Sequence, residues 1–510
     1  MKRALVSVSD KTNLLPFVEG LVKNGYEIIS TGGTNNALHA AGIPTISIDS
    51  VTGFPEILEG RVKTLHPLVH GGLLAKRDDE LHVKAVKENG IEYIDLVCVN
   101  LYPFAQTLAN PNSTHADKIE NIDIGGPSML RSAAKNYNDV TVVTDVSDYE
   151  AVLAEIENNG DTTVATRQML AGKVFNHTAA YDAMIASYFD EVNEVVTPQL
   201  LTKTYTLKQN LRYGENPHQA AAFYETAGAH AYSVVNSEQL HGKELSYNNI
   251  ADANAALEIV AEFDSPAAVA VKHMNPCGVG IGANIDEAFD KAYAADPVSI
   301  FGGIIALNKT VTAATAQKLN GIFLEIIIAP DFEPAALEIL QSKKNLRLLK
   351  TPMNNEQQSS KRLVSVTGGL LIQDADQLKM SISNMTVKTK KAPNEVDMEQ
   401  LSFGMRVVKH VKSNAIVLVK DNMTIGVGAG QMNRVGAAKI ALEQAGEKAK
   451  GAYLASDAFF PMADTVELAA KYGIKGIIQP GGSIKDQDSI DACDNLGITM
   501  VMTGTRHFKH

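Results

Sequence analysis

The sequence predicts an α/β protein that begins with a doubly wound parallel sheet. Short apolar runs bounded by Gly, Asn or Asp occur at residues 4–8, 26–30, 96–99 and 140–143. Stretches of helical periodicity separate these runs, and buried strands alternating with helices are typical of parallel sheets. Because ligands bind beyond the carboxyl ends of such strands, we expect a site formed by residues 7–11, 31–34 and 100–104.

A chain of 510 residues leaves room for about three folding units. A helical stretch rich in Ala and acidic residues over 147–191 predicts one long helix, and the periodicity stops near residue 200. The polar stretch 381–394 predicts a linker or an exposed edge strand. The predicted domains are 1–200 and 201–510, the second with subdomains of about 201–380 and 381–510.

The two subdomains resemble each other weakly. Each has an apolar strand, a Gly-Val-Gly strand end and a loop that contains Phe. These features fall at 268–271, 278–280 and 299–302, and again at 415–419, 426–428 and 457–460. An internal duplication explains the likeness, and so does a coincidence of strand-end loops. Ligand sites often form between such halves.

Composition excludes several classes of protein. Lys and Arg number 46 against 58 Asp and Glu, a net charge of −12, which argues against a nucleic-acid-binding protein. No apolar run is long enough to span a membrane, and we expect neither a membrane partner nor a secretory signal. The 3 cysteines, Cys98, Cys277 and Cys493, are too few for a disulfide framework and indicate a cytoplasmic protein.

The turn Thr31-Gly32-Gly33-Thr34 follows an apolar run and opens a helical stretch. Its backbone N–H groups could bind a phosphate, or its glycines could only allow a strand-to-helix turn. Ser9 and Lys11 lie at another strand end, which favours an anion site. The chain has no P-loop motif and no well-placed dinucleotide fingerprint.

Three further groups lie near the same predicted sheet edge. The segment 60–67 contains Arg61 and Lys63, which form a ligand-binding loop or a solvated charge run. The side chain of Tyr102 lies either at this edge, where it could meet a ligand, or in the core. Asp123 is either an acid–base residue or a helix N-cap.

Lys272 and His273 end the apolar run 268–271 and precede a turn. Both side chains can reach one cavity from that place, although a lone histidine is usually structural. The pair Pro276-Cys277 is similar to part of the zinc deaminase motif, but position 280 is Gly and no H-x-E precedes it. Zinc-activated water is therefore not expected.

Ten motifs occur in order along the chain: S-V-S-D-K-T, T-G-G-T, G-R-V-K-T-L-H-P, N-L-Y-P-F, I-D-I-G-G, A-A-K-N, L-R-Y-G-E-N-P-H-Q, V-K-H-M-N-P-C-G, G-A-G-Q-M-N-R and D-A-F-F-P. Together they resemble the bifunctional purine biosynthesis family, in which phosphoribosylaminoimidazolecarboxamide (AICAR) formyltransferase is fused to IMP cyclohydrolase. The resemblance implies a methylglyoxal-synthase-like first domain, followed by two cytidine-deaminase-like subdomains without zinc.

The resemblance also implies the chemistry. Formyl transfer from 10-formyl-tetrahydrofolate to the 5-amino group of AICAR would give FAICAR, and ring closure of FAICAR would give IMP. We expect a cytoplasmic homodimer that needs no metal; a structural monovalent cation is left open. The alternative is a nucleotide-binding or folate-binding protein that retains one activity, and a nucleic-acid deaminase is a more distant alternative.

The resemblance assigns roles to individual residues. His273 would be the general base of formyl transfer, Lys272 would stabilise the oxyanion or protonate the leaving folate nitrogen, and Asn414 would orient the reactants. In ring closure Lys135 would transfer a proton, while the formyl and carboxamide groups would be polarised by Lys63, Tyr102 and Asp123.

The resemblance also implies a set of substrate-binding residues. In the first domain these are Ser9, Asp10, Lys11, Thr31, Gly32, Gly33, Thr34, Arg61, Thr64, Asn100, Ile124 and Gly125. In the second they are Arg212, Tyr213, Phe301, Gly302, Glu325, Arg434, Val435, Phe459, Asp464, Ser483 and Arg506. Three positions depart from the family pattern: Glu325 replaces the more frequent Asp, Thr31 replaces a serine and Val99 replaces a cysteine.

Overall fold

The structure is a computed structural model that describes residues 1–226, 229, 231–353 and 361–510. It divides into two compact units, Met1–Tyr205 and Thr206–His510. No helix in these described ranges is long and apolar enough to cross a membrane.

Unit 1 contains a parallel sheet of five strands in the order β3-β2-β1-β4-β5. The strands are β1 (Lys2–Val8), β2 (Tyr26–Ser30), β3 (Ile46–Ser47), β4 (Leu96–Asn100) and β5 (Thr141–Val143). The chain builds outward from β1 to β3 and then returns to place β4 on the other side of β1. This reversal opens a crevice beyond the carboxyl ends of β1 and β4, and the predicted doubly wound sheet is confirmed.

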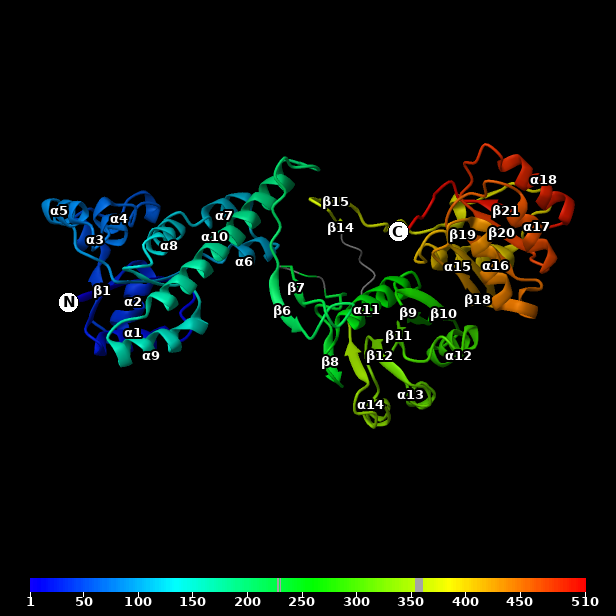
Figure 1. Ribbon diagram of the computed structural model, residues 1–510, viewed down its shortest axis with the longest axis horizontal. Coiled ribbons are helices and arrows are strands. Elements are labelled where there is room, and N and C mark those ends of the chain that lie inside the picture. The colour runs from blue at the N-terminus through cyan, green and yellow to red at the C-terminus, as the bar shows by residue number, and fades with distance from the viewer. Residues whose placement is uncertain (227–228, 230, 354–360) are drawn as a thin grey trace. The chain divides into compact units, whose positions relative to one another are not determined.

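Helices cover the sheet of unit 1, and the longest of them, α10, packs beside α8 (Figure 1). In α1, Leu14, Phe17, Val18 and Leu21 are buried because their spacing puts them on one face of the helix. The helical elements are α1 (Leu14–Lys23), α2 (Gly32–Ala40), α3 (Ile48–Thr52), η1 (Leu58–Gly60), α4 (Pro67–Leu74), α5 (Glu80–Glu88), α6 (Phe104–Ala109), α7 (His115–Glu120), α8 (Gly125–Lys135), η2 (Val146–Asp148), α9 (Tyr149–Asn159) and α10 (Val164–Val192).

The prediction of one helix over 147–191 is wrong, because α9 and α10 are separate. Gly160 ends α9 with a φ of 76°, a conformation that glycine adopts at little cost. The Thr163 hydroxyl then accepts the Thr166 N–H at 3.2 Å and begins α10. The sequence signals for this break were therefore a helix-ending glycine and a capping threonine three residues later.

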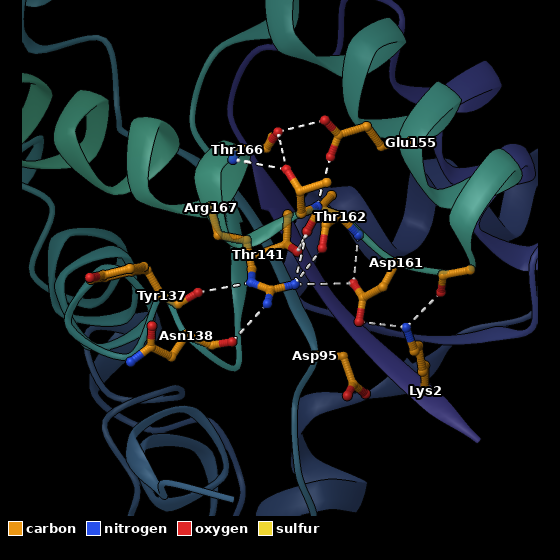
Figure 2. A network of polar contacts seen from close by, with 12 residues as sticks. Lys2, Asp95, Tyr137, Asn138, Thr141, Glu155, Asp161, Thr162, Thr166 and Arg167 are labelled. Carbon is orange, nitrogen blue, oxygen red and sulfur yellow. Dashed lines mark hydrogen bonds and ion pairs between the residues drawn. The ribbon is translucent and has the colours of Figure 1, made fainter.

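Arg167 fixes α10 to the rest of unit 1 (Figure 2). Its buried guanidinium donates to the carbonyls of Tyr137 at 2.9 Å and Asn138 at 2.8 Å, just beyond α8. A third bond, 2.6 Å long, goes to the carbonyl of Thr162. One side chain thus satisfies backbone groups of two loops that would otherwise be left unpaired.

Among the described residues of unit 2, a sheet of twelve strands has the order β16-β21-β20-β19-β17-β18-β10-β9-β11-β12-β13-β8. Its first half is β8 (Glu238–His241), β9 (Ala267–Lys272), β10 (Asn275–Ile281), β11 (Gly303–Leu307), β12 (Leu324–Ala329) and β13 (Arg347–Lys350). Its second half is β16 (Thr386–Val387), β17 (Ile416–Lys420), β18 (Met423–Gly428), β19 (Tyr453–Ser456), β20 (Gly476–Gln479) and β21 (Thr499–Met502).

The two halves of this sheet have the same topology, which supports an internal duplication. β9 pairs antiparallel with β10 and β11, as β17 does with β18 and β19. Beyond them lie two parallel strands and an antiparallel edge strand in each half. β10 and β18 join the halves through the pairing of Gly280 with Met423. The polar stretch 381–394 contains β16, and an edge strand was one of its two predicted forms.

The repeated glycines of β10 and β18 allow a helix to lie close to each strand. A Cβ at Gly278 would be 2.1 Å from the Ala292 carbonyl oxygen, and one at Gly428 would be 1.9 Å from that of Ala437. The helical elements of this unit are α11 (Tyr247–Val260), α12 (Ile285–Ala295), α13 (Ala313–Asn320), α14 (Pro334–Gln341), η3 (Ile382–Asn384), α15 (Glu395–Val408), α16 (Arg434–Ala445), η4 (Gly446–Ala449), α17 (Asp464–Lys471) and α18 (Asp486–Leu496).

Two hairpins complete unit 2. They are β6 (Thr206–Leu211) with β7 (Ala221–Glu225), and β14 (Lys361–Val366) with β15 (Gly369–Asp374). The second hairpin exposes most of its apolar side chains, including Leu371 at 61%. A two-stranded hairpin is only marginally stable alone, so these side chains need a surface to pack against.

Candidate functional site

A cavity of about 540 Å³ lies in the crevice of unit 1. It brings together most residues that were predicted for this unit, from five separate stretches of sequence. Those in its lining are Ser9, Lys11, Thr31, Gly32, Gly33, Thr34, Arg61, Lys63, Thr64, Asn100, Tyr102, Asp123, Ile124 and Gly125.

Short hydrogen bonds fix the two loops that follow β1 and β2. The Ser7 and Thr31 hydroxyls lie 2.7 Å apart. The Thr34 hydroxyl accepts the Val8 N–H at 3.0 Å and donates to the Val8 carbonyl at 2.9 Å. The T-G-G-T turn is therefore held against β1, and Gly32 has the positive φ, 41°, that one prediction required.

Two helix N-termini open into this cavity. Neither Thr31 before α2 nor Ile124 before α8 caps its helix with a side chain, and the first residues of both helices line the cavity. Free N–H groups and the positive end of the helix dipole favour an anion there. The arrangement suits a phosphate together with a second polar group of the same ligand.

Lys63 approaches the T-G-G-T turn, since a Cβ at Gly32 would lie 3.8 Å from its ammonium nitrogen. Its ion pair with Glu56 is long, at 3.6 Å. Arg61 pairs with Glu120 at the exposed side of the cavity. Lys63 is thus the less firmly paired of the two cations and the better placed to meet a ligand.

Tyr102 lines the cavity and is 44% exposed, so it is not a core residue. Asp123 lies beside it and accepts the Gly126 N–H at 2.8 Å, so it does stabilise the start of α8. Burial raises the pKa of the Asp123 carboxyl, and hydrogen bonds from Gly126 and Tyr102 with the charge of Lys63 only partly oppose this. Such a carboxyl can exchange a proton nearer neutral pH than an exposed aspartate.

The structure leaves two predicted residues outside the cavity lining. The Asp10 side chain accepts from the N–H and hydroxyl of Thr12, which hold its pKa below the usual range. Lys135 ends α8, about 15 Å along the helix from Gly125 at 1.5 Å per residue. It lines a separate open cavity of about 530 Å³ with Arg131 and Phe175.

In unit 2, Lys272 and His273 lie at the turn between β9 and β10. The Lys272 ammonium donates to the Phe301 carbonyl at 2.7 Å, and a Cβ at Gly302 would be 3.1 Å from that nitrogen. The His273 side chain is exposed. Sequence positions 272, 273, 301 and 302 are thus brought to one place, and His273 is not a core histidine.

Asn414 comes to the same edge of the sheet from the second half. Asn275 makes the connection: its amide accepts the Lys412 N–H at 3.1 Å and donates to the His273 carbonyl at 3.0 Å. The Asn414 side chain accepts from Arg434 at 2.7 Å. Arg434 is itself buried and ion-paired with Asp457.

The other predicted residues of unit 2 lie on or after strands, or in the first turns of helices. Arg212 stacks on Tyr213 at 5.6 Å after β6, and Glu325 on β12 pairs with Arg347 at 2.7 Å. Val435 lies in the first turn of α16, and Asp464 in the first turn of α17. Phe459, Ser483 and Arg506 follow β19, β20 and β21.

Asn275 and Asp457 were missed as site residues. Asn275 stands in V-K-H-M-N-P-C-G and Asp457 in D-A-F-F-P, so the motifs contained both. The Asp457 side chain accepts the Ser413 hydroxyl at 2.6 Å and the Ala415 N–H at 3.2 Å, contacts between residues more than 40 positions apart. In the part of the chain that the structure describes, no group of three or more His, Cys, Asp or Glu side chains could hold a metal ion.

The fold defines an α/β protein with a polar cavity in unit 1 that suits an anion. In unit 2 it brings Lys272, His273 and Asn414 to the same end of nearby strands. Family models agree: residues 13–128 match an MGS-like domain, and residues 133–444 match the AICARFT/IMPCHase bienzyme. Bifunctional purine biosynthesis protein PurH of Bacillus cereus (strain B4264) is 62% identical over 509 residues, covering 100% of both chains. The Bacillus mycoides (strain KBAB4) protein of the same name matches equally, at 62% over 509 residues.

A crystal structure of ForH aligns with 37% of this chain and 98% of its own, with 40% identity and a TM-score of 0.34. The chain belongs to the AICARFT/IMPCHase bienzyme family, the bifunctional purine biosynthesis proteins. It is an AICAR formyltransferase and an IMP cyclohydrolase of purine biosynthesis, and formyl transfer implies a folate co-substrate.

Proposed function

We propose that the cavity of unit 1 binds FAICAR and closes its ring. The observation that carries this assignment is that Lys63, Tyr102 and Asp123 line one cavity with the T-G-G-T turn. The turn and Lys11 would hold the phosphate, and the N-terminus of α8 would face the base.

Ring closure joins the carboxamide nitrogen to the formyl carbon, and the formyl oxygen leaves as water. One proton leaves the carboxamide nitrogen and another leaves the formylamino nitrogen. Lys63 and Tyr102 would polarise the formyl oxygen, and Asp123 would act on the carboxamide. Because the reaction is intramolecular, most of the acceleration comes from positioning.

Lys135 does not line this cavity, because it ends α8 whereas Gly125 at the start of that helix lies in the lining. We infer that a role in proton transfer requires Lys135 to come from a second chain. Co-expressed Lys63→Ala and Lys135→Ala chains test this: mixed dimers would regain ring closure at one of two sites, whereas action within one chain would leave all dimers inactive.

In unit 2, His273 would take a proton from the 5-amino nitrogen of AICAR as that nitrogen attacks the formyl carbon. Lys272 would stabilise the oxyanion or protonate the folate nitrogen as the carbon–nitrogen bond breaks. Asn414, held by Arg434, would orient the reactants. The hydrogen bonds of Asn275 to both segments support this grouping.

A homodimer is supported by two observations on unit 2. The predicted binding residues extend from β12 to β21, nine strands along the sheet, or roughly 38 Å at 4.8 Å per strand. In one chain, a nucleotide and a folate would have to span this whole distance to contact all of them, whereas a second chain could supply some of the residues. The apolar β14–β15 hairpin also needs a covering surface, which a second copy would supply.

Light scattering tests the dimer. Leu371→Asp on the hairpin should shift the chain toward monomer, while Val196→Asp, at another exposed apolar position (80% exposed), should not. If Leu371→Asp leaves the dimer intact, the hairpin is not part of the interface.

A cytoplasmic location remains a prediction, supported by the three free cysteines of the described residues.

The two activities can be separated in one assay with AICAR and 10-formyl-tetrahydrofolate. Lys63→Ala should release tetrahydrofolate without forming IMP. His273→Ala should block tetrahydrofolate release but still convert supplied FAICAR to IMP. If His273→Ala keeps the wild-type rate of formyl transfer, the proposed role of His273 is wrong.

A further inference from the structure

The turn that carries His273 has an unfavourable backbone for its residues. Lys272 pairs with Asn275 across β9 and β10, so only His273 and Met274 form the turn. Their φ values are 51° and 62°. Positive φ at both central positions is the pattern of a type I′ turn, which Asn and Gly favour. For other residues this conformation costs about 1 kcal/mol or more each, so the surroundings must hold it.

Packing of the turn residues does not provide that support. The Met274 side chain is 40% exposed, and that of His273 is also exposed. The turn is instead held through its backbone: the Asn275 amide binds the His273 carbonyl, and the Met274 N–H donates to the carboxylate of Asp252 at 2.7 Å.

Asp252 stands in the middle of α11, a helix that packs against β9. A carboxylate accepts a backbone N–H more strongly than a neutral group does. The position has a cost, because burial raises the pKa of the Asp252 carboxyl, an effect opposed by the Met274 N–H and by the charges of His273 and Lys272. An asparagine could make the same hydrogen bond without a buried charge.

We propose that Asp252 is a positioning residue for formyl transfer, fixing the backbone at Met274 so that the His273 imidazole points toward the reacting amine. This inference rests on the proposed role of His273. In this proposal Asp252 acts on the reaction through the turn and not by contact with a substrate.

Steady-state kinetics of formyl transfer by the full chain would test the proposal. Asp252→Ala should lower kcat by about 10-fold to 100-fold, the cost of misplacing a catalytic group, with KM for AICAR and for folate within about 2-fold of wild type. Asp252→Asn keeps the acceptor oxygen and should retain most of kcat. Asn254→Ala, at an exposed position of the same helix, is the matched control and should leave kcat unchanged.

Two double variants separate positioning from general stability. Adding Met274→Gly to Asp252→Ala should restore part of kcat, because glycine adopts a positive φ without penalty. Adding Asp252→Ala to His273→Ala should cost nothing further, because Asp252 acts through His273. Ring closure of supplied FAICAR by unit 1 should be normal in every variant.

Three outcomes would overturn the inference. In the first, Asp252→Ala keeps its kcat while His273→Ala is inactive, so Asp252 has no role although the proposed function stands. In the second, Asp252→Asn is as slow as Asp252→Ala and Met274→Gly gives no recovery, which indicates a structural role only. In the third, His273→Ala is fully active, and the proposed role of His273 fails together with this inference.

Discussion

The side chain of Asn100 holds the loop after β1 through three hydrogen bonds. Its oxygen accepts the N–H groups of Ser9 at 2.6 Å and Asp10 at 3.0 Å, and its nitrogen donates to the Asp10 carbonyl at 3.1 Å. Replacing Asn100 with aspartate would remove the donor, and replacing it with leucine would remove all three hydrogen bonds. The residue is predicted to bind nucleotide, and the structure gives it a further task, because Ser9 and Lys11 line the cavity from this loop.

We expect Asn100→Ala to raise the KM of ring closure by about 100-fold, since it removes three hydrogen bonds that each contribute about 1 kcal/mol to loop order. Formyl transfer in unit 2 should not change. Initial rates with supplied FAICAR provide the measurement, and Asn89→Ala, which alters a polar residue at the end of α5, is the control. An unchanged KM would mean that the loop is ordered without Asn100.

At the scale of elements, the start of α8 lies unusually close to its neighbours. A Cβ at Gly126 would lie 2.5 Å from the Asp123 carboxylate and 2.9 Å from the Leu101 side chain. One at Gly125 would lie 2.7 Å from the Thr64 hydroxyl. The helix can therefore place its free N–H groups at the cavity only because its first two residues have no side chain.

Gly126→Ala should displace Asp123 and reduce kcat of ring closure at least about 10-fold, with a stability cost of about 1–3 kcal/mol. Glu157→Ala, at an exposed position of α9 that lines neither cavity, is the control. It should leave ring closure unchanged and alter stability by no more than about 0.5 kcal/mol. Wild-type ring closure in Gly126→Ala would show that Asp123 tolerates displacement.

Much of this arrangement could be predicted from sequence because it depends on neighbours in the chain. An apolar run followed by T-G-G-T predicts both a strand end and the residues that line it. Lys272 and His273 were recognisable for the same reason. The bond of Asp252 to Met274 depends on how α11 packs against β9. The position of Lys135 depends on the length of α8, which places it about 15 Å along the helix from Gly125. Gly160 and Thr163 indicated the break between α9 and α10, but the helical periodicity on both sides favoured one continuous helix.

At the scale of the molecule, a buried ion cluster ties the two halves of unit 2 together. Glu262, just beyond α11, contacts Lys409 at 2.8 Å and His410 at 3.0 Å, both just beyond α15. Only 4% of the Glu262 side chain and 1% of that of Lys409 are exposed. Burial alone would raise the pKa of Glu262, but the hydrogen bond from His410 and the charge of Lys409 outweigh it, so the pKa lies below its usual range.

Glu262→Gln should destabilise unit 2 by about 3 kcal/mol at pH 7, because it leaves Lys409 buried without a counter-charge. A lowered folded-state pKa gives stability that is fully present above the ordinary glutamate value of about 4 and is lost as the pH falls through the lower one. The difference between wild type and variant should therefore shrink below about pH 4.

Hydrogen exchange of peptides from β9 and β17, followed by mass spectrometry, measures the free energy of unfolding of unit 2 separately from that of unit 1. Glu338→Gln, at an exposed position on α14, is the control. A difference that stays constant down to pH 3 would contradict the assignment of the effect to the ionised carboxylate.

The pairing of β10 with β18 also bears on how the chain is made. Gly280 leaves the ribosome 143 residues before its partner Met423, which at 5–20 residues per second is roughly 7–29 s. During that interval the first half can form its sheet, but β10 is an open edge. Pro276, which has no N–H, and the glycines of β10 make that edge a poor template for another strand. β10 is thus a central strand of the finished sheet but an edge strand while the second half is still being synthesised. Its proline and glycines suit this temporary position.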